Sequence, residues 1–289
     1  MPTYAVTGAS GHFGRRVVEE LLDRGIPGTA IVAIARKTAK AADLAARGVQ
    51  VREGDYSRSE TLPPALMGVD RLLLISGSEL GQRVPQHTAV IKAAKDAGLE
   101  RILYTSILKA DTSTNPIAGE HRGTETALRM SAVPYTLLRN GWYAENYTER
   151  LAQYLETGEI LGAVGSGRVS AAPRADFAVA AAAALLADEQ GNVVYELGGP
   201  AFSFDEMAST ISEVTDKAVV YRDLPPSDYL AVLQRIGLDE ATAEFVVAID
   251  ASIVAGDLET DSDDLAQLLG RKPTPLAEIF RAAIAGLDS

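Results

Sequence analysis

Residues Thr3–Gly14, TYAVTGASGHFG, carry the strongest local signal for the fold. A short apolar strand ends at Thr7, and an amphipathic helix begins at His12. Between strand and helix, one glycine permits a tight turn, the next lets the backbone approach a ligand, and the third lets the helix pack closely. The helix N-terminus then offers free N–H groups to an anion. This context predicts a dinucleotide-binding loop made of Gly8, Ala9, Ser10, Gly11, His12, Phe13 and Gly14.

Strand and helix patterns alternate along the first two thirds of the chain, which distinguishes this loop from an ordinary Gly-rich turn. Apolar runs predict further strands at 30–35, 49–53, 71–75, 101–105 and 134–138, with helical segments between them. Such alternation implies right-handed crossovers and a mostly parallel sheet covered on both faces. We therefore expect an α/β fold, a Rossmann-type doubly wound parallel sheet, with its dinucleotide-binding domain at residues 1–141.

Beyond residue 141 helical segments dominate, among them 144–156, 174–187, 204–215 and 241–255. Short strands are predicted at 193–197 and 218–221, and later segments of this kind are available to complete the sheet. We expect residues 142–289 to form mainly a smaller, mostly helical C-terminal lobe that binds substrate at the sheet edge.

Composition excludes several classes of protein. The 289 residues include no cysteine, which excludes disulfides and thiolate metal sites, and the three histidines lack metal-ligand spacing. A net charge of −12 argues against nucleic-acid binding. No apolar run reaches the roughly 18 residues of a membrane span, and the chain opens on a strand, not a signal sequence. We expect a cytoplasmic protein, a monomer or homodimer, with no metal, no nucleic-acid partner and no membrane insertion.

The end of the second predicted strand distinguishes NAD from NADP. An NAD site usually has Asp or Glu about 20 residues beyond the glycines, where it binds the ribose 2′-hydroxyl. Arg36 stands there instead, followed by Lys37, and a guanidinium can pair with a 2′-phosphate. We predict NADP(H), against the alternative of a solvated basic pair at a strand end. The loops predicted to line the rest of the cofactor are Asp55-Tyr56 and Ser76-Gly77-Ser78.

The Tyr-x-x-x-Lys pair of ordinary short-chain dehydrogenases is missing, because no tyrosine is followed by lysine at that spacing. Other polar side chains are candidates near the nicotinamide: Tyr104 and Thr105 at the end of the fifth strand, His121 on the next helix and Asn140 after the sixth strand. The competing interpretations are an exposed helix-start residue for His121 and a turn residue for Asn140. His87 is predicted to lie on a helix face.

Seven segments together resemble the NmrA-like branch of the atypical short-chain dehydrogenases, and within it the bacterial NADPH:quinone oxidoreductase group. They are VTGASGHFG, VAIAR, REGDY, LLLISGSELGQRVPQH, YTSILKADTS, EHRGTE and PYTLLRNGWYAENY, spread over nearly the whole chain. The related triphenylmethane dye reductases differ in the fourth and seventh segments. The resemblance implies an NADPH-dependent quinone reductase. It also implies a cofactor site that includes Gly8 to Phe13, Arg36, Ser76 to Ser78, Asn140, Gly141, Trp142, Tyr143 and Glu145.

A quinone needs little acid assistance, because it is already electrophilic and hydride addition yields an aromatic hydroquinone anion. We hypothesise direct hydride transfer from NADPH without flavin, with a proton from His121, Tyr104 or water. His121 stands where the related isoflavone-reductase-like enzymes carry a functional lysine. Trp142, Tyr143 and Tyr147 are candidates for a wall against a planar substrate, although the last two are helix-spaced, for which core packing is the commoner explanation.

Two other functions remain open. Some NmrA-like proteins bind the dinucleotide without turnover and act as redox-sensing regulators through protein partners. The second alternative is reduction of another planar electrophile, such as a cationic triphenylmethane dye. Consumption of NADPH distinguishes an enzyme from a sensor, and a substrate panel distinguishes quinones from dyes.

Overall fold

Seven strands form one central sheet in the structure, a computed structural model that describes residues 1–287. Their spatial order is β3-β2-β1-β4-β5-β6-β9, and every neighbouring pair is parallel. The predicted doubly wound α/β sheet is confirmed, and the segment at 193–197 supplies its seventh strand. The strands are β1 (Tyr4–Val6), β2 (Ile31–Ala35), β3 (Gln50–Glu53), β4 (Arg71–Leu74), β5 (Arg101–Ile107), β6 (Tyr135–Asn140) and β9 (Val193–Leu197).

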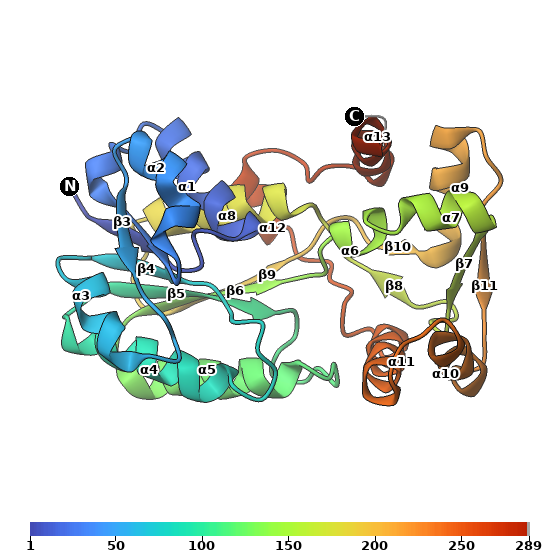
Figure 1. Ribbon diagram of the computed structural model, residues 1–289, viewed down its shortest axis with the longest axis horizontal. Coiled ribbons are helices and arrows are strands. Elements are labelled where there is room, and N and C mark those ends of the chain that lie inside the picture. The colour runs from blue at the N-terminus through green and yellow to red at the C-terminus, as the bar shows by residue number, and fades with distance from the viewer. Residues whose placement is uncertain (288–289) are drawn as a thin grey trace.

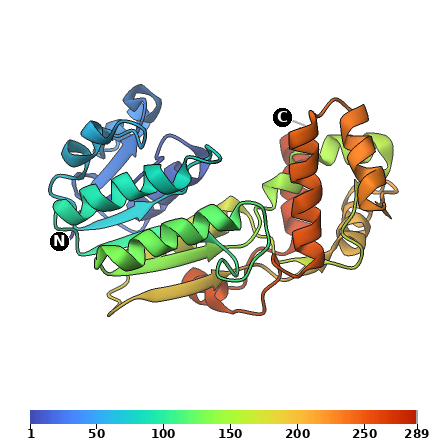
Figure 2. The same cartoon turned by 90° about the horizontal axis from the view of Figure 1, so that it is seen from below.

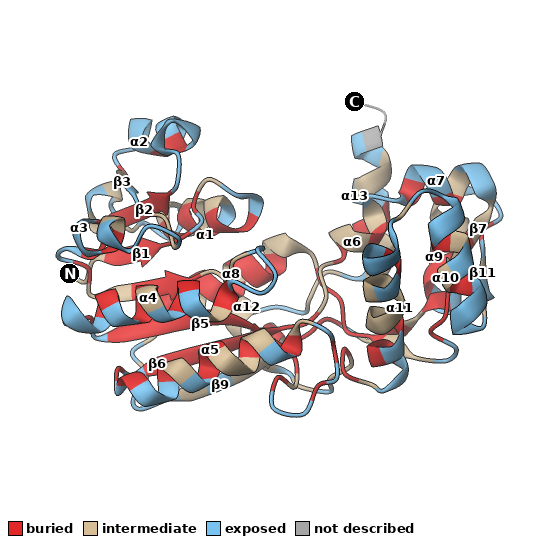
Figure 3. Cartoon of the chain, turned by 60° about the horizontal axis from the view of Figure 1, so that its bottom comes forward, coloured by how far each residue is buried: buried red, intermediate tan, exposed pale blue. Residues whose placement is uncertain are grey.

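Helices cover both faces of the sheet (Figure 1). Successive side chains of a strand point to opposite faces, so Val6 joins the core on one side and Ala5 the core on the other. Both cores are apolar, which explains why the inner strands are mostly apolar; they are drawn as buried in Figure 3, whereas the edge strands β3 and β9 are more exposed. One layer holds α1 (His12–Asp23), α8 (Arg174–Leu186) and α12 (Asp264–Leu269). The other holds α3 (Leu62–Leu66), with α4 (Arg83–Asp96) and α5 (Ala118–Ser131) side by side (Figure 2).

Two helical segments expected between the strands begin with a short 3₁₀ turn. These turns are η2 (Thr38–Ala41), which precedes α2 (Ala42–Ala46), and η3 (Ser59–Thr61), which precedes α3. Another 3₁₀ turn, η1 (Gly28–Ala30), precedes β2. The prediction of a single helix at 144–156 is wrong, because the chain forms two helices there, α6 (Glu145–Thr148) and α7 (Leu151–Thr157). The N–H of Arg150 bonds to the carbonyl of Tyr147, three residues back, and this tighter turn separates the two helices.

A second group of elements, here called the C-terminal lobe, lies beyond the carboxyl edge of the sheet, on the right in Figure 1. Its core gathers Phe202, Met207, Ile253 and Phe280. Strands β7 and β11 pair in parallel, and β8 and β10 pair antiparallel. The lobe comprises α6, α7, β7 (Glu159–Gly162), β8 (Arg168–Val169), β10 (Phe202–Ser203), α9 (Phe204–Thr215), β11 (Val220–Asp223), α10 (Pro226–Arg235), α11 (Glu240–Val254) and α13 (Leu276–Leu287).

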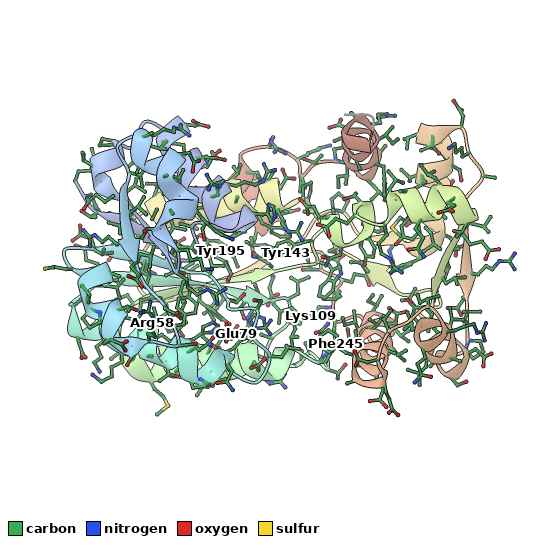
Figure 4. The ribbon with its side chains drawn as sticks, viewed as in Figure 1. Arg58, Glu79, Lys109, Tyr143, Tyr195 and Phe245 are labelled. Atoms are coloured by element: carbon green, nitrogen blue, oxygen red, sulfur yellow. The ribbon has the colours of Figure 1, made fainter. Side chains whose placement is uncertain are left out.

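The chain passes between sheet and lobe more than once, because α8, β9 and α12 pack with the sheet although they follow residue 141. Polar contacts also join the two parts. The Lys109 ammonium (Figure 4) donates to the carbonyl of Gly256 at 2.8 Å. The backbone and hydroxyl of Thr114 both donate to Asp257 at 2.7 Å. The loop after β5 therefore holds the lobe against the carboxyl edge of the sheet. Within residues 1–287, no helix is long and apolar enough to cross a membrane.

Candidate functional site

Two glycines shape the loop between β1 and α1. Gly8 has a φ of +60°, a left-handed conformation that the tight turn requires. A Cβ on Gly14 would stand 2.5 Å from the carbonyl oxygen of Gly8, so only glycine lets α1 pack this closely. No side chain caps the N-terminus of α1, where Gly11 is the N-cap. The first N–H groups of α1 are therefore free to bind an anion.

A groove opens at the carboxyl ends of the central strands, where the strand order reverses between β1 and β4. Its first part, here called the first cavity, has a volume of about 280 Å³. The loops after four neighbouring strands converge on this cavity and bring the predicted residues of those loops together. It is lined by Gly8, Ser10, Gly11, Arg36, residues 54–57, residues 75–79 and Gln86.

Arg36 borders the first cavity with its side chain 66% exposed. Its Nη1 donates to the Glu79 carboxylate at 3.1 Å. An exposed ion pair of this kind contributes little to stability, so the guanidinium can exchange the carboxylate for a phosphate at little cost. The position directly after β2 fits contact with a 2′-phosphate.

Asp55 and Tyr56 line the first cavity and are held there by hydrogen bonds of their own side chains. The Tyr56 hydroxyl donates to the carbonyl of Ile75 at 2.9 Å. The Asp55 carboxylate accepts from the N–H of Ser57 at 3.0 Å, an Asx turn. The Tyr56 ring is therefore held against the cavity by its own hydroxyl.

The loop Ser76-Gly77-Ser78 is held by two side chains of α4 and one of β5. Gly77 donates its N–H to Nε2 of His87 at 2.9 Å, and its carbonyl accepts from Nε of Arg83 at 2.6 Å. The N–H of Ser76 donates to the Thr105 hydroxyl at 2.8 Å. His87 is fully buried, and its Nδ1 lies 2.9 Å from the Thr124 hydroxyl on α5. The sequence pattern did not single out Arg83 or assign His87 this contact.

Burial lowers the pKa of His87 to about 4, with the positive charge of Arg83 acting in the same direction. The ring is therefore neutral at neutral pH. A neutral imidazole has one acceptor nitrogen, whereas an imidazolium has none. Neutrality is thus what allows Nε2 to accept the N–H of Gly77.

A second cavity of about 200 Å³ continues the groove beyond Ser76, which borders both cavities. It lies at the carboxyl ends of β5 and β6, next to the C-terminal lobe. Tyr143 stands at this junction in Figure 4. The predicted residues that the second cavity brings together are Ser76, Thr105, His121, Asn140, Gly141, Trp142 and Tyr143, and its other walls are Arg83, Ser106, Ile107, Ile117 and Asn146.

His121 borders the second cavity but is only 4% exposed, so the interpretation of an exposed helix-start residue is wrong. Its Nδ1 lies 2.8 Å from the hydroxyl of Tyr104, which is itself fully buried and does not line the cavity. Burial lowers the pKa of His121 to about 3, and the charge of Arg83 adds to the effect. His121 is therefore a neutral imidazole at neutral pH. Burial likewise raises the pKa of the Tyr104 hydroxyl well above its usual range.

Asn140 ends β6 and is 5% exposed. Its Oδ1 is buried and has no hydrogen-bond partner among the residues that the structure describes. A buried, unpaired acceptor is costly and points to a missing donor. The carboxamide of a nicotinamide carries such N–H donors. The residues at this edge therefore fit a nicotinamide dinucleotide, with its phosphates at the Gly8–Gly14 loop.

Some predicted cofactor residues line neither cavity: Ala9, His12, Phe13, Gly14 and Glu145. Ala9 is fully buried, and its N–H donates to the carbonyl of Ile34 at 3.1 Å. The Glu145 carboxylate accepts the N–H of Arg174 at 2.9 Å and so caps the start of α8. Ala9 and Glu145 thus hold elements that frame the groove.

The fold and the groove define a Rossmann-type dinucleotide-binding protein. The NAD(P)H-binding family model matches residues 8–188, and the chain belongs to this family. The described residues contain no group of three acidic or histidine side chains that could hold a metal ion.

The chain is similar over nearly its full length to proteins of known activity. Quinone oxidoreductase 2 of Escherichia coli strain K12 is 45% identical over 275 residues, which cover 95% of this chain and 96% of the relative. The crystal structure of an Escherichia coli NADPH-dependent quinone oxidoreductase with NADPH has a TM-score of 0.93 and 43% identity, over 99% of this chain and 100% of that one. The Citrobacter sp. triphenylmethane reductase with NADP(H) has a TM-score of 0.92 and 39% identity, over 97% and 100%. The resemblance inferred from the sequence is thereby confirmed, as is NADP(H) as the cofactor.

Proposed function

We propose that this protein is an NADPH-dependent reductase of quinones that transfers hydride directly, without a flavin. One observation carries the proposal: a single groove joins an anion-binding loop to a second cavity that holds the unpaired amide oxygen of Asn140. The similarity to Escherichia coli quinone oxidoreductase 2 supports a quinone as the acceptor.

Different residues bind different parts of the cofactor in this proposal. The free N–H groups of α1 bind the pyrophosphate, Arg36 binds the 2′-phosphate, and Asn140 accepts from the carboxamide. His87 and Arg83 hold the Gly77 loop in position at the wall of the first cavity. When bound, NADPH supplies the hydride. Positioning of this kind is the main contribution that a protein makes to such a reaction.

His121 acts on the acceptor as a neutral hydrogen-bond donor. Where the Tyr104 hydroxyl donates to Nδ1, the neutral ring carries its proton on Nε2 and can donate it to a quinone oxygen. Such a bond stabilises the negative charge that develops on that oxygen. Tyr104 is fully buried and a weak acid, so it orients the ring and does not touch the substrate. Water then supplies the proton to the hydroquinone anion.

The two parts of the chain have separate roles in this proposal. Residues 1–141, completed by α8 and β9, bind the cofactor, and most of residues 142–289 form the lobe that binds the acceptor. Trp142 and Tyr143 border the second cavity from the side of the lobe and exclude water from the reacting centre. The protein acts as a monomer or homodimer, which sedimentation equilibrium distinguishes.

A second acceptor class is favoured by the structural similarity to Citrobacter sp. triphenylmethane reductase. Cationic triphenylmethane dyes are electrophilic at their central carbon and accept hydride there, and their aryl rings offer apolar faces to the same aromatic wall. Substrate competition distinguishes the two classes: the better acceptor has the higher kcat/KM and inhibits reduction of the other.

The test follows NADPH absorbance with purified protein and 1,4-benzoquinone, with NADH in parallel and a control without enzyme. We expect enzyme-dependent oxidation that favours NADPH, at a rate unchanged by added flavin. Binding of NADPH without consumption by any quinone or dye would overturn the proposal and leave the dinucleotide-sensing function. Turnover that requires added flavin would overturn the direct transfer.

A further inference from the structure

A further cavity lies next to the groove, inside the C-terminal lobe. This third cavity has a volume of about 210 Å³, and Trp142 and Asn146 border both this cavity and the second. A single water needs only roughly 10–15 Å³, so the third cavity has room for an organic group. Its walls come from α6 and α7 on one side and from α10 and α11 on the other, the helices around the middle of the lobe in Figure 1.

Aromatic rings make up much of the wall of the third cavity. The Tyr147 ring is fixed edge-on against Phe204, with the ring centroids 5.5 Å apart, and against Phe202 at 6.1 Å. Rings held in this way offer a flat apolar surface to another ring. The aromatic residues that line the cavity are Trp142, Tyr147, Tyr154, Phe204 and Tyr229.

Polar side chains interrupt this aromatic wall: Asn146, Arg150 and Asp250 line the cavity, together with tyrosines. The hydroxyl of Tyr147, a residue 8% exposed, is buried and has no hydrogen-bond partner among the described residues. Asp250 is 7% exposed, and its Oδ2 accepts the N–H of Ala163 at 2.8 Å. Buried polar atoms in native proteins are nearly always paired, so an unpaired hydroxyl beside a cavity is available to a polar group bound there.

Asp250 adds negative charge to the third cavity at neutral pH. Burial raises the pKa of its carboxyl group to about 6, while the bond from Ala163 and the positive charge of Arg150 act in the opposite direction. The carboxylate is therefore ionised at pH 7, and an ionised carboxylate only accepts hydrogen bonds. A ligand group that pairs with it must carry an N–H or O–H donor.

We propose that the third cavity is a distal subsite of the acceptor site, which takes a second aromatic ring bearing a hydroxyl or amino group. The donor of that ring bonds to Asp250, and the Tyr147 hydroxyl bonds to the same substituent. The inference rests on the proposed function, because it places the reducible ring of the acceptor in the second cavity. It makes the preferred acceptor an extended two-ring quinone.

A binding experiment tests the subsite without turnover. Trp142 is the only tryptophan in the chain, and it borders the third cavity, so its fluorescence reports occupancy. Protein loaded with NADP⁺ is titrated with 4-hydroxybiphenyl and with biphenyl. We expect 4-hydroxybiphenyl to bind about tenfold more tightly, as one hydrogen bond to a charged group provides. Equal affinity for the two compounds in the parent protein would overturn the proposal.

Two substitutions assign the preference to the named groups. Tyr147→Phe removes one oxygen and keeps the ring packing, and Asp250→Asn removes the charge and keeps the side-chain shape. We expect each to reduce the preference for 4-hydroxybiphenyl to about twofold or less. Asp228→Asn, at the exposed start of α10, makes the same chemical change outside the cavity and keeps the parent preference. An unchanged preference in both cavity variants would overturn the proposal; thermal melting verifies that they are folded.

Turnover gives a second, separate readout. Two substituted acceptors, (4-hydroxyphenyl)-1,4-benzoquinone and phenyl-1,4-benzoquinone, are compared by their kcat/KM, with unsubstituted 1,4-benzoquinone as the one-ring reference. We expect a hydroxyphenyl preference, expressed mainly in KM, that both cavity variants lose and that Asp228→Asn keeps. If no quinone is reduced, the proposed function fails and the fluorescence titration still decides whether the subsite exists. If quinones are reduced without any hydroxyphenyl preference, the distal subsite alone fails.

Discussion

The imidazole of His87 holds the backbone of Gly77: the N–H of Gly77 donates to Nε2 at 2.9 Å, and Nδ1 is fixed 2.9 Å from the Thr124 hydroxyl. A fully buried side chain on α4 thus sets the position of the loop after β4, which borders the first cavity. The contact requires a neutral ring, which the lowered pKa of about 4 provides.

Replacing His87 by alanine removes the acceptor of the N–H of Gly77, a half-buried residue. A lost hydrogen bond of this kind costs about 0.5–1.5 kcal/mol, and part of this cost appears as displacement of the loop. We expect His87→Ala to raise the KM for NADPH about tenfold and to lower kcat less. Steady-state kinetics with NADPH as the varied substrate measure the effect.

Thr88→Ala is the matched control for this prediction, because it truncates the next residue of the same helix on its exposed side. Its KM for NADPH should stay within about twofold of the parent value. A parent-like KM for His87→Ala would show that the Gly77 loop keeps its position without the imidazole.

Gly14→Ala places a methyl group 2.5 Å from the backbone oxygen of Gly8, a clash that only a shift of α1 relieves. We expect a loss of about 1–3 kcal/mol in the free energy of unfolding, the usual cost of overpacking, together with at least tenfold weaker NADPH binding. Gly119→Ala is the control, since its new Cβ meets nothing closer than the Arg122 guanidinium at 4.0 Å and alanine favours a helix. Urea unfolding and NADPH fluorescence titration measure both variants. Equal stability of the two would contradict the packing argument.

Arg36→Ala tests the choice between NADPH and NADH. Hydrogen bonds to charged groups contribute about 1.5–3 kcal/mol, so we expect the kcat/KM for NADPH to fall roughly 10- to 100-fold while that for NADH is unchanged. Glu79→Gln makes the complementary test, because it removes the carboxylate that pairs with Arg36. It should lower the Kd for NADPH slightly and leave NADH binding as it was. If Arg36→Ala lowered the kcat/KM for NADPH and for NADH equally, Arg36 would not distinguish the two nucleotides, and its role would be limited to the stability of the protein.

The features that could be predicted from the sequence are the local ones. Short stretches of sequence contain the glycine spacing at Gly8–Gly14, the basic residue after β2 and the alternation of strands and helices. These local patterns predict the fold and the cofactor. Strand β9 was predicted as a strand but not as the partner of β6, because that pairing joins residues more than fifty positions apart. Pairings of such range leave no local pattern.

The supporting residues of the site were harder to predict for the same reason. His87 stands three, four and seven residues before Val90, Ile91 and Ala94, all buried on α4, so helical spacing already indicated its burial. Its role depends on the loop and on α5, which only the folded chain brings to it. Tyr147 and Asp250 are likewise a hundred residues apart in sequence, and they border one cavity only after the lobe has folded.

Burial of His121 as a neutral ring predicts a loss of stability in acid. The unfolded chain protonates this histidine near its ordinary pKa of 6.5, whereas the folded chain does so only near 3. Between these values the unfolded state binds more protons, so the free energy of unfolding falls as the pH decreases from about 6.5 toward 3. His121→Gln removes this contribution. Its loss of stability between pH 7 and pH 4 should be smaller than that of the parent by roughly 3 kcal/mol, at 1.36 kcal/mol per pKa unit.

Urea unfolding at both pH values, followed by the fluorescence of Trp142, measures this difference. Protonation of carboxylates affects parent and variant alike and cancels in the comparison. His12→Gln removes an exposed imidazole from the start of α1 and serves as the control for the substitution itself. If His121→Gln lost as much stability between pH 7 and pH 4 as the parent does, His121 would already be charged in the folded protein. A charged ring would act as a proton donor to the quinone, and the assignment of a neutral donor beside Tyr104 would have to be abandoned.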